Sequence, residues 1–170
     1  MKIRAETEAD RATIFAVNEQ AFGEEEVPRL VDAIRASTRF VPELSLVAEV
    51  DGEIVGHVML SYVDIEPGSV QVLQLGPLAV LPSHHRRGIG SALMHEALRL
   101  SDERGEPLVF IEGDPRYHER FGFTRADLSG IDPPVGAHGP QYFMVRPLSA
   151  YDPTLRGQAV YPPETFGTVT

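Results

Sequence analysis

The densest basic stretch of this acidic chain lies directly before two glycines. Residues 84–94 read HHRRGIGSALM, while the whole sequence has a formal net charge of -10. The first N–H groups of a helix have no partner within the helix, and the helix dipole adds partial positive charge there. Glycines let a phosphate approach that backbone closely, and arginine guanidinium groups donate to phosphate oxygens. The spacing predicts a site for a di- or triphosphate, although an ordinary turn with solvated arginines fits the same pattern.

Other signatures of phosphate, metal and hydrolase sites are incomplete. A dinucleotide fingerprint needs a third glycine where Leu93 stands, and no GxxxxGK[ST] motif is present. His95 and Glu96 begin like an HExxH zinc motif, but Arg99 occupies the position of its second histidine. The sequence also contains no G-x-S-x-G stretch. We therefore expect no metal centre and no serine-hydrolase chemistry.

The composition limits the class of protein. A chain of 170 residues, 42% of them hydrophobic, is expected to form one domain with one core. The sequence has no apolar run of about 18 residues and no apolar leader, so we expect a cytoplasmic protein with no membrane partner. Because it contains no cysteine, disulfides, thiolate nucleophiles and cysteine-ligated metals are excluded. The negative charge argues against nucleic-acid binding and favours cationic substrates.

The first half of the chain shows the patterns of a strand, two helices and a hairpin. A strand at Lys2–Glu6 precedes a helix that Thr7 caps and Gly23 ends, and a second helix starts among Glu24–Glu26. Two longer apolar runs flank Asp51-Gly52, a dipeptide typical of tight hairpins. The strands of this hairpin are expected at 44–50 and 53–65.

The second half predicts the elements around the basic stretch. A strand at 70–81 is interrupted by Gly76-Pro77, where a bulge or splay is expected because proline cannot donate a ladder hydrogen bond. A helix should then run from near Gly90 to Gly105. Further elements are expected as a strand at 107–112, a short helix at 116–121 and a last strand at 142–146, with irregular structure after Phe123. The order β-α-α-β-β-β-α-β-α-β is that of an α+β or mixed α/β layer fold.

The residues around the basic stretch resemble a known family. LGPLAVLPSHHRRGIGSALM is similar to motif A of the GNAT acetyltransferases, with His85, Arg86, Arg87, Gly88, Ile89 and Gly90 at the motif positions. GDPRYHERFGF, at 113–123, resembles the final helix of that family. Together with LGPLAVLP and a late GxxVYPP..F at 157–166, this sequence pattern resembles that of a branch of predicted bacterial N-acetyltransferases called YhbS-like. The resemblance covers nearly the whole chain.

The resemblance implies an acyl-CoA N-acyltransferase fold, in which helices flank a central twisted mixed sheet with two splayed parallel strands. It implies one domain at 1–146 and a Pro-rich extension at 147–170 packed on that domain. Acetyl-CoA would be the co-substrate, without a metal. Its pantetheine would pair with the main chain of residues 78–80, its pyrophosphate would bind amides of residues 87–91, and the Leu78 N–H would face the thioester carbonyl as an oxyanion donor. The implied cofactor-binding residues are Leu78, Ala79, Val80, His85, Arg86, Arg87, Gly88, Ile89, Gly90, Ser91, Tyr117 and Phe121.

The implied reaction is acetyl transfer to a primary amine by direct attack in a ternary complex, since the chain has no cysteine to carry an acyl intermediate. The general base stays open. A glutamate serves in the histone-acetyltransferase branch, but Gln74 stands at that position and cannot take a proton. Glu112 and the glutamates at 24–26 are candidates, while His57 is expected to be structural.

The proton donor for the departing thiolate is expected on the helix at 116–121. Counting back from the family's Gly-Phe pair, the position of the acid tyrosine holds His118, with Tyr117 one residue earlier. We expect His118 to be the acid by position, with Tyr117 as its rival. Their side chains should point about 100° apart around the helix.

The acceptor is an unidentified small-molecule amine or protein amino group. The first two helices should wall its site, where Phe22, Glu24 and Glu25 could offer an apolar rim with negative charge. The segment 131–141 could act as a lid, and a homodimer is compatible with the sequence without support from any residue. Two other functions are compatible with the motifs: a non-catalytic acyl-CoA-binding module of the same fold, and a different nucleotide-binding protein that uses the same anion loop.

Overall fold

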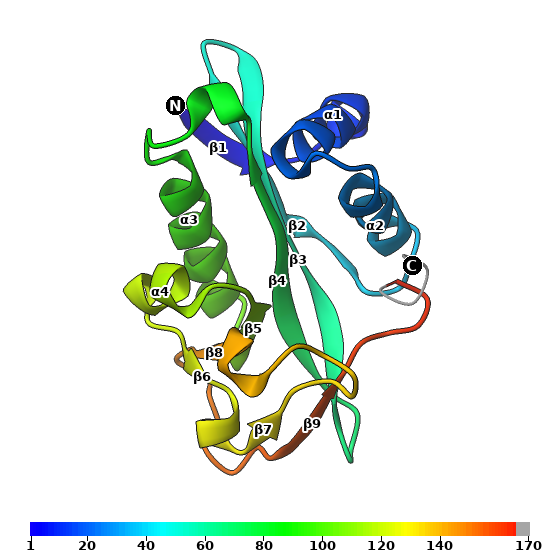
Figure 1. Ribbon diagram of the computed structural model, residues 1–170, viewed down its shortest axis with the longest axis vertical. Coiled ribbons are helices and arrows are strands. Elements are labelled where there is room, and N and C mark those ends of the chain that lie inside the picture. The colour runs from blue at the N-terminus through cyan, green and yellow to red at the C-terminus, as the bar shows by residue number, and fades with distance from the viewer. Residues whose placement is uncertain (166–170) are drawn as a thin grey trace.

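Nine strands form one mixed sheet within residues 1–165, the part of the chain that the structure describes. The computed structural model places helices on both sides of this sheet (Figure 1). The strands are β1 (Lys2–Ala5), β2 (Phe40–Val50), β3 (Glu53–Glu66), β4 (Val70–Val80), β5 (Leu108–Glu112), β6 (Thr124–Arg125), β7 (Ile131–Asp132), β8 (Phe143–Pro147) and β9 (Gly157–Val160). The α-helices are α1 (Arg11–Phe22), α2 (Glu26–Arg35), α3 (Ile89–Glu103) and α4 (Pro115–His118). Short 3-10 turns are η1 (Glu8–Asp10), η2 (Pro82–His84), η3 (Glu119–Phe121), η4 (Asp127–Ser129) and η5 (Pro140–Tyr142).

The sheet combines hairpin and crossover connections. Its order is β1-β2-β3-β4-β5-β8-β6, and β9 joins by pairing with both β3 and β7. Strands β4 and β5 run parallel, as do β7 and β9, while the other pairs are antiparallel. This arrangement confirms the mixed α/β layer fold expected from the sequence.

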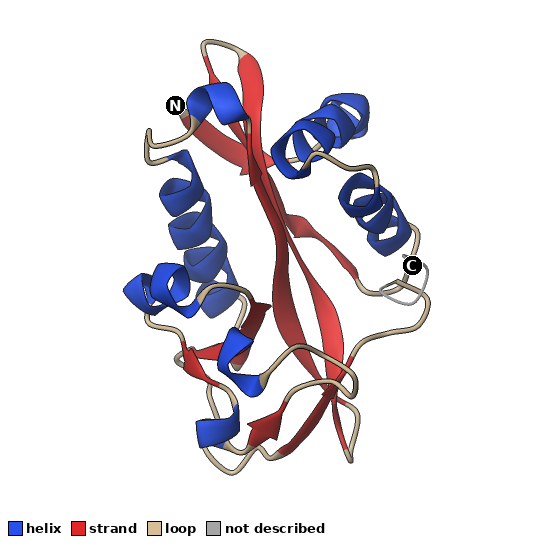
Figure 2. Cartoon of the chain, in the orientation of Figure 1, coloured by secondary structure: helices blue, strands red, loops and turns tan. Residues whose placement is uncertain are grey.

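The two faces of the sheet carry different helices (Figure 2). Leu46 and Val47 are neighbours on β2, so their side chains point to opposite faces. Leu46 belongs to the apolar cluster that includes Leu93 of α3. Val47 packs in the cluster that includes Ile14 of α1 and Val31 of α2. No helix in residues 1–165 is long and apolar enough to cross a membrane.

The hairpin between β2 and β3 turns where the sequence predicts it. Asp51 and Gly52 have φ angles of +52° and +81°, and Val50 pairs with Glu53 across the turn. Positive φ at both central residues is the geometry that favours glycine, aspartate and asparagine in two-residue hairpins. The expected antiparallel pair is therefore confirmed.

A bulge interrupts β4 at the predicted place. Val58 of β3 pairs with Leu78, whereas Leu60, two residues further along β3, pairs with Leu75, three residues back along β4. Gly76-Pro77 therefore contributes one residue more than β3 opposes. An extra residue bends the bulged strand and increases its twist.

Strands β4 and β5 separate next to this bulge. They pair at two positions only, Leu73 with Val109 and Gln74 with Phe110. Beyond Gln74, the edge of β4 that faces β5 has no strand partner among the described residues. This divergence confirms the splayed parallel strands implied by the family resemblance.

The structure corrects the expectations for the C-terminal part. The strand expected to be the last, at 142–146, is β8, and β9 follows it within the Pro-rich remainder. The segment after Phe123, expected to be irregular, contains the short strands β6 and β7. Two-residue strands have no periodicity to read, and β9 forms because β3 extends beyond the end of β2 and offers it an edge. Residues 166–170, including Phe166 of the late motif, lie outside the described residues, and the division at residue 146 stays a prediction.

Some predicted boundaries also shift by a few residues. The strand expected from residue 44 begins at Phe40, across a register irregularity before Ser45. The second helix begins at Glu26, so that Glu24 lies in the turn after α1. The helix expected from near Gly90 begins at Ile89.

Candidate active site

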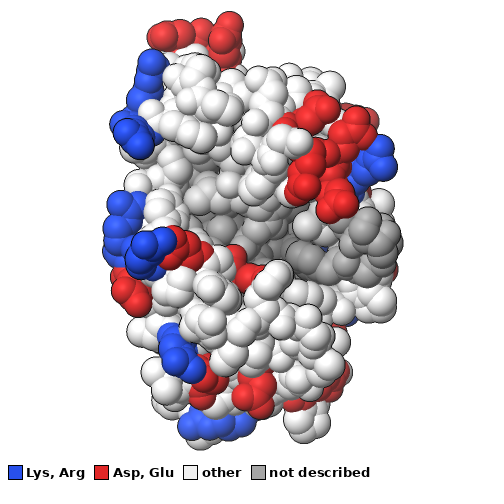
Figure 3. Space-filling model, viewed as in Figure 1, with Lys and Arg blue, Asp and Glu red and all other residues white. Residues whose placement is uncertain are grey.

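A cleft of about 900 Å³ opens where β4 and β5 diverge. Its walls come from β4 at and beyond the bulge, the end of β5, the start of α3, α4, and the facing parts of α1 and α2. The space-filling view shows a hollow in the middle of this face, with acidic side chains gathered over the turn between α1 and α2 (Figure 3). The residues expected to bind the cofactor that line this cleft are Leu78, Val80, His85, Arg86, Gly88, Ile89, Gly90, Ser91 and Tyr117.

The loop before α3 has the geometry of an anion site. Arg86 and Gly88 have φ angles of +61° and +77°, and helical structure starts at Ile89. The Gly88 carbonyl accepts from Ala92 N at 3.0 Å, so it belongs to the first turn of the helix. The N–H groups of that turn lack partners within the helix and point out of its end. A loop with this path exposes backbone donors next to the cleft.

The side chains of this loop leave its positive charge available. Arg86 and Arg87 are exposed, and neither makes an ion pair with another described residue. Arg87 does not line the cleft, whereas Arg86 does. The His85 ring lies 2.9 Å from the Val80 carbonyl oxygen and ties the loop to the end of β4.

Gly90 lies where three elements meet. A Cβ atom at this position would lie 3.2 Å from the hydroxyl oxygen of Tyr117 and 3.7 Å from Cγ2 of Val80. Gly90 does not have a positive φ angle. Glycine is therefore needed here because it has no side chain, and not because of its backbone conformation. A side chain would fill the gap between α3 and α4.

His118 is buried in the wall of the cleft. Its exposed fraction is 8%, and Nδ1 has no hydrogen-bond partner in the described part of the chain. Its ring packs over Gly113, where a Cβ atom would come within 2.5 Å of Cε1. Burial lowers the pKa of His118 below the ordinary 6.5, although Asp114 acts in the opposite direction. The neutral imidazole is therefore favoured at neutral pH.

Tyr117 is half-buried and points its hydroxyl toward Gly90. Its ring contacts His118 and Phe121, with centroids 5.2 Å and 5.4 Å away, and the Arg120 guanidinium lies 4.6 Å from its ring centroid. Phe121 does not line the cleft, but its ring packs against the Tyr117 ring. Tyr117 and His118 thus line one cleft with different surroundings, a phenol near the loop and an imidazole in an apolar wall.

Of the remaining predicted residues, some lie away from the cleft. The Ala79 side chain is buried and does not line it, so only its main chain could contact a ligand there. Phe22 lines the cleft, whereas Glu24 and Glu25 do not and are exposed beside it. Glu25 forms an ion pair with Arg29 one helical turn away.

Glu112 lines the cleft from the end of β5 and is surrounded by polar partners. Tyr161 donates from its hydroxyl to the Glu112 carboxylate at 3.1 Å, and Gln74 Nε2 donates to the Tyr161 hydroxyl at 3.1 Å. His138 Nδ1 lies 2.9 Å from the other Glu112 oxygen. The sequence pointed to Glu112 and Gln74, whereas Tyr161 and His138 come to this place only through the fold. The late GxxVYPP pattern marks Tyr161, but nothing in that pattern places it beside β5.

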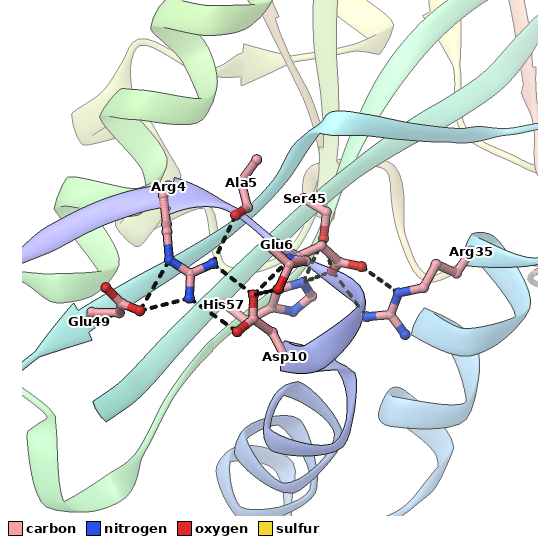
Figure 4. Close-up of polar contacts among 9 residues, drawn as sticks. Arg4, Ala5, Glu6, Asp10, Arg35, Ser45, Glu49 and His57 are labelled. Carbon is pink, nitrogen blue, oxygen red and sulfur yellow. Dashed lines mark hydrogen bonds and ion pairs between the residues drawn. The ribbon is translucent and has the colours of Figure 1, made fainter. Parts of the chain in front are cut away.

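His57 is a structural residue, as expected from its position in the middle of a strand. It is fully buried, with Nδ1 3.1 Å from Asn18 Nδ2 and Nε2 3.0 Å from Ser45 Oγ. Ser45 donates to Glu6, which also accepts from Arg35 (Figure 4). Because Asn18 supplies an N–H, His57 carries its proton on Nε2 and donates to Ser45. His57 does not line the cleft.

Comparison with known proteins shows which family has a similar sequence. A model described as "Acetyltransferase (GNAT) family" matches residues 11–123. The protein named "Uncharacterized N-acetyltransferase YhbS" from Escherichia coli (strain K12) is 33% identical over 127 residues, which cover 74% of this chain and 75% of that protein.

Two solved structures are also similar. The Escherichia coli GNAT family N-acetyltransferase YhbS in complex with CoA superposes with a TM-score of 0.88 and 28% identity, covering 96% of this chain and 90% of that one. A GNAT family acetyltransferase from Brucella melitensis in complex with acetyl-CoA superposes with a TM-score of 0.78 and 31% identity, covering 96% of both chains.

Proposed function

Since this chain belongs to the acetyltransferase (GNAT) family, we propose that it transfers the acetyl group of acetyl-CoA to a primary amine by direct attack in a ternary complex. The observation that carries the proposal is the cleft of about 900 Å³, in which the gap between β4 and β5 opens beside the basic start of α3. Similar chains that hold CoA or acetyl-CoA support this choice of acyl donor.

The unpaired edge of β4 is the proposed seat of the pantetheine. The main chain of Leu78, Ala79 and Val80 would pair with it as a neighbouring strand would. The carbonyl of Val80 is the exception, because it already contacts the His85 ring. The N–H of Leu78 would donate to the thioester oxygen, whose negative charge grows during attack. Residues 87–91 would bind the pyrophosphate through backbone N–H groups, with Arg86 and Arg87 adding charge.

The proposed proton donor for the departing thiolate is one of two adjacent residues. The motif position favours His118, whereas its burial reduces the share of imidazolium at neutral pH. The Tyr117 hydroxyl faces the space beside Gly90 in the same cleft. We therefore propose Tyr117 as the donor at neutral pH and keep His118 as its alternative.

The acceptor is proposed to be a cationic primary amine. Acidic side chains gather over the turn between α1 and α2 beside the hollow (Figure 3), and the whole chain has a net charge of -10. Negative potential around a cleft raises the local concentration of cations. A cytoplasmic location and a homodimer stay predictions.

Two measurements test the proposed function. Calorimetry with acetyl-CoA, CoA and ATP is expected to show binding of both CoA forms and none of ATP. Thiol release from acetyl-CoA is then followed with a panel of aliphatic diamines, arylethylamines and peptides with a free α-amino group. Binding of acetyl-CoA without thiol release would favour the non-catalytic module, and binding of ATP alone would favour a different nucleotide-binding protein.

A further inference from the structure

Glu112 occupies the junction of two cavities. It lines the cleft of about 900 Å³ and also a neighbouring cavity of about 610 Å³, whose other walls include Asp114, Arg116, His138 and Tyr142. The Glu112 side chain is 32% exposed, so its carboxylate reaches ligands as well as water. An amine that enters through either cavity meets this carboxylate.

The hydrogen bonds around Glu112 have a defined direction. The Gln74 amide has N–H donors, so its Nε2 donates to the Tyr161 oxygen, and the Tyr161 O–H is left to donate to Glu112. Burial and the nearby charge of Glu112 raise the pKa of Tyr161 well above its ordinary value, although the Gln74 hydrogen bond acts in the opposite direction. Tyr161 therefore keeps its proton and donates it in the hydrogen bond to the Glu112 carboxylate.

The position of Gln74 explains why this carboxylate is needed. Gln74 pairs with Phe110 on β5, two residues before Glu112. The side chains of Gln74 and Glu112 both contact the hydroxyl of Tyr161. Gln74 cannot accept the proton of an amine, because its amide is not basic. A carboxylate at the end of the neighbouring strand supplies that capacity from across the gap between β4 and β5.

We propose that Glu112 takes the proton of the acceptor amine and that Tyr161, from the C-terminal segment, is a positioning residue that orients and stabilises the Glu112 carboxylate. This inference rests on the proposed acetyl transfer. The C-terminal segment would then complete the acceptor end of the site. Tyr161 would act through Glu112 and would not contact the acyl donor.

The proposed step balances without a further reactant. The amine nitrogen forms a bond to the acetyl carbon, the carbon–sulfur bond breaks, and Glu112 receives a proton from nitrogen. The CoA sulfur receives a proton from the donor on α4, the second proton lost by nitrogen replaces that proton on the donor through solvent, and Glu112 returns its own proton to water at its exposed side. The net change is one ammonium and one thioester giving one amide, one thiol and one released proton.

Several other titratable groups surround Glu112. His138 faces it from the segment after β7, and Asp114, which is paired with Arg116, shares the smaller cavity. His118 shares the larger cleft. A pH effect of Tyr161 on Glu112 must therefore be measured at Glu112 itself.

Three variants test the inference. Glu112→Gln is expected to lower kcat about a hundredfold or more while acetyl-CoA binding measured by calorimetry is unchanged. Tyr161→Phe removes one donor to the carboxylate, so it is expected to lower kcat/KM for the amine about tenfold and to move the acid limb of its pH profile up by about one unit. Tyr151→Phe is the matched control, because Tyr151 packs against the same apolar cluster without a hydroxyl hydrogen bond in the described structure.

A direct titration gives a readout that does not depend on turnover. The carbon-13 shift of the Glu112 carboxyl, followed by NMR, is expected to change in Tyr161→Phe, where the carboxylate loses a hydrogen-bond donor, and to stay as in the wild type in Tyr151→Phe. An unchanged Glu112 carboxyl shift in folded Tyr161→Phe would overturn the positioning role. Full kcat in Glu112→Gln would overturn the base role alone, whereas wild-type protein that binds acetyl-CoA and acetylates no amine would overturn the proposed transfer as well.

Discussion

Tyr161 donates a hydrogen bond to Glu112 at 3.1 Å, across 49 residues of chain. One residue belongs to the segment after β9 and the other ends β5, at the mouth of the gap between β4 and β5. The contact depends on β9, which pairs with the end of β3 and carries the chain back to the cleft. The late segment is thereby linked to the place where we propose that chemistry occurs.

Gly157, at the start of β9, tests this link through the backbone. Its φ is +144°, and a Cβ atom there would clash with the carbonyl of Glu66. We expect Gly157→Ala to destabilise the protein by roughly 2 kcal/mol and to reduce activity, because β9 would shift away from β3. Thermal unfolding and thiol release check both effects. Gly105→Ala is the control, since Gly105 has a φ of +79° but no neighbour that a Cβ would meet within 4 Å.

Replacement of Gly90 tests the anion loop. Gly90→Val would place a branched side chain against Tyr117 and Val80, in the space that a phosphate group would need. We expect the dissociation constant for acetyl-CoA to rise about tenfold or more, which corresponds to roughly 1.4 kcal/mol. Calorimetry measures the constant, and the thermal midpoint shows that the variant is folded. Unchanged affinity for acetyl-CoA in a folded variant would contradict the proposal that this loop binds the acyl donor.

The two loop arginines should act through charge. Arg86→Ala and Arg87→Ala are each expected to weaken acetyl-CoA binding at low salt and to have a smaller effect at high salt, because exposed charges are screened. Calorimetry at two ionic strengths checks this dependence. Arg11→Ala serves as the control, because Arg11 lies on α1 and does not line the cleft. Equal losses at both ionic strengths would mean that the arginines act by packing instead.

The proton donor can be identified from the pH dependence of kcat. If Tyr117 donates, Tyr117→Phe should lower kcat about a hundredfold with little change in acetyl-CoA affinity, and His118→Gln should retain most activity. If His118 donates, the rate requires imidazolium. Since burial lowers the pKa of His118, kcat would then fall as the pH rises through a value below 6.5. Full activity in both variants would leave water as the donor.

The buried network around Glu6 should make stability depend on pH. Burial acts to raise the pKa of Glu6, but contacts with His57, Arg35 and Ser45 lower it from 4.5 to about 2. Burial also lowers the pKa of His57, so it folds as the neutral imidazole. In both cases the unfolded chain binds more protons in acid, and stability falls as the pH decreases. The loss from His57 begins near its ordinary 6.5, and the loss from Glu6 follows between 4.5 and about 2.

Chemical denaturation between pH 7 and pH 3 measures this loss of stability. Glu6→Gln is expected to cost about 3 kcal/mol at neutral pH, because it removes the buried carboxylate that pairs with Arg35 and leaves that arginine only its ion pair with the exposed Asp32, and to flatten the acid part of the profile. Glu8→Gln is the control, since the Glu8 side chain is 89% exposed. A Glu6→Gln variant with the wild-type acid profile would contradict the role of this network.

The sequence by itself determined the parts of the fold that depend on neighbouring residues. Asp51-Gly52 marks the hairpin because these residues tolerate positive φ, and Gly76-Pro77 marks the bulge because proline cannot complete a ladder. The start of α3 follows from glycines and apolar spacing in one short stretch. Such signals can be read from a sequence because each depends on the conformation of only a few consecutive residues.

Only the tertiary structure decided which distant side chains meet. Strands β6, β7 and β9 are too short to show a period, and they form because longer strands offer them free edges. No local pattern could show that Tyr161 and His138 would contact Glu112, or that His118 would be buried against Gly113. Burial, hydrogen-bond partners and pKa shifts arise from the packing of segments that are remote along the chain, so they become fixed only when the sheet and its helices assemble.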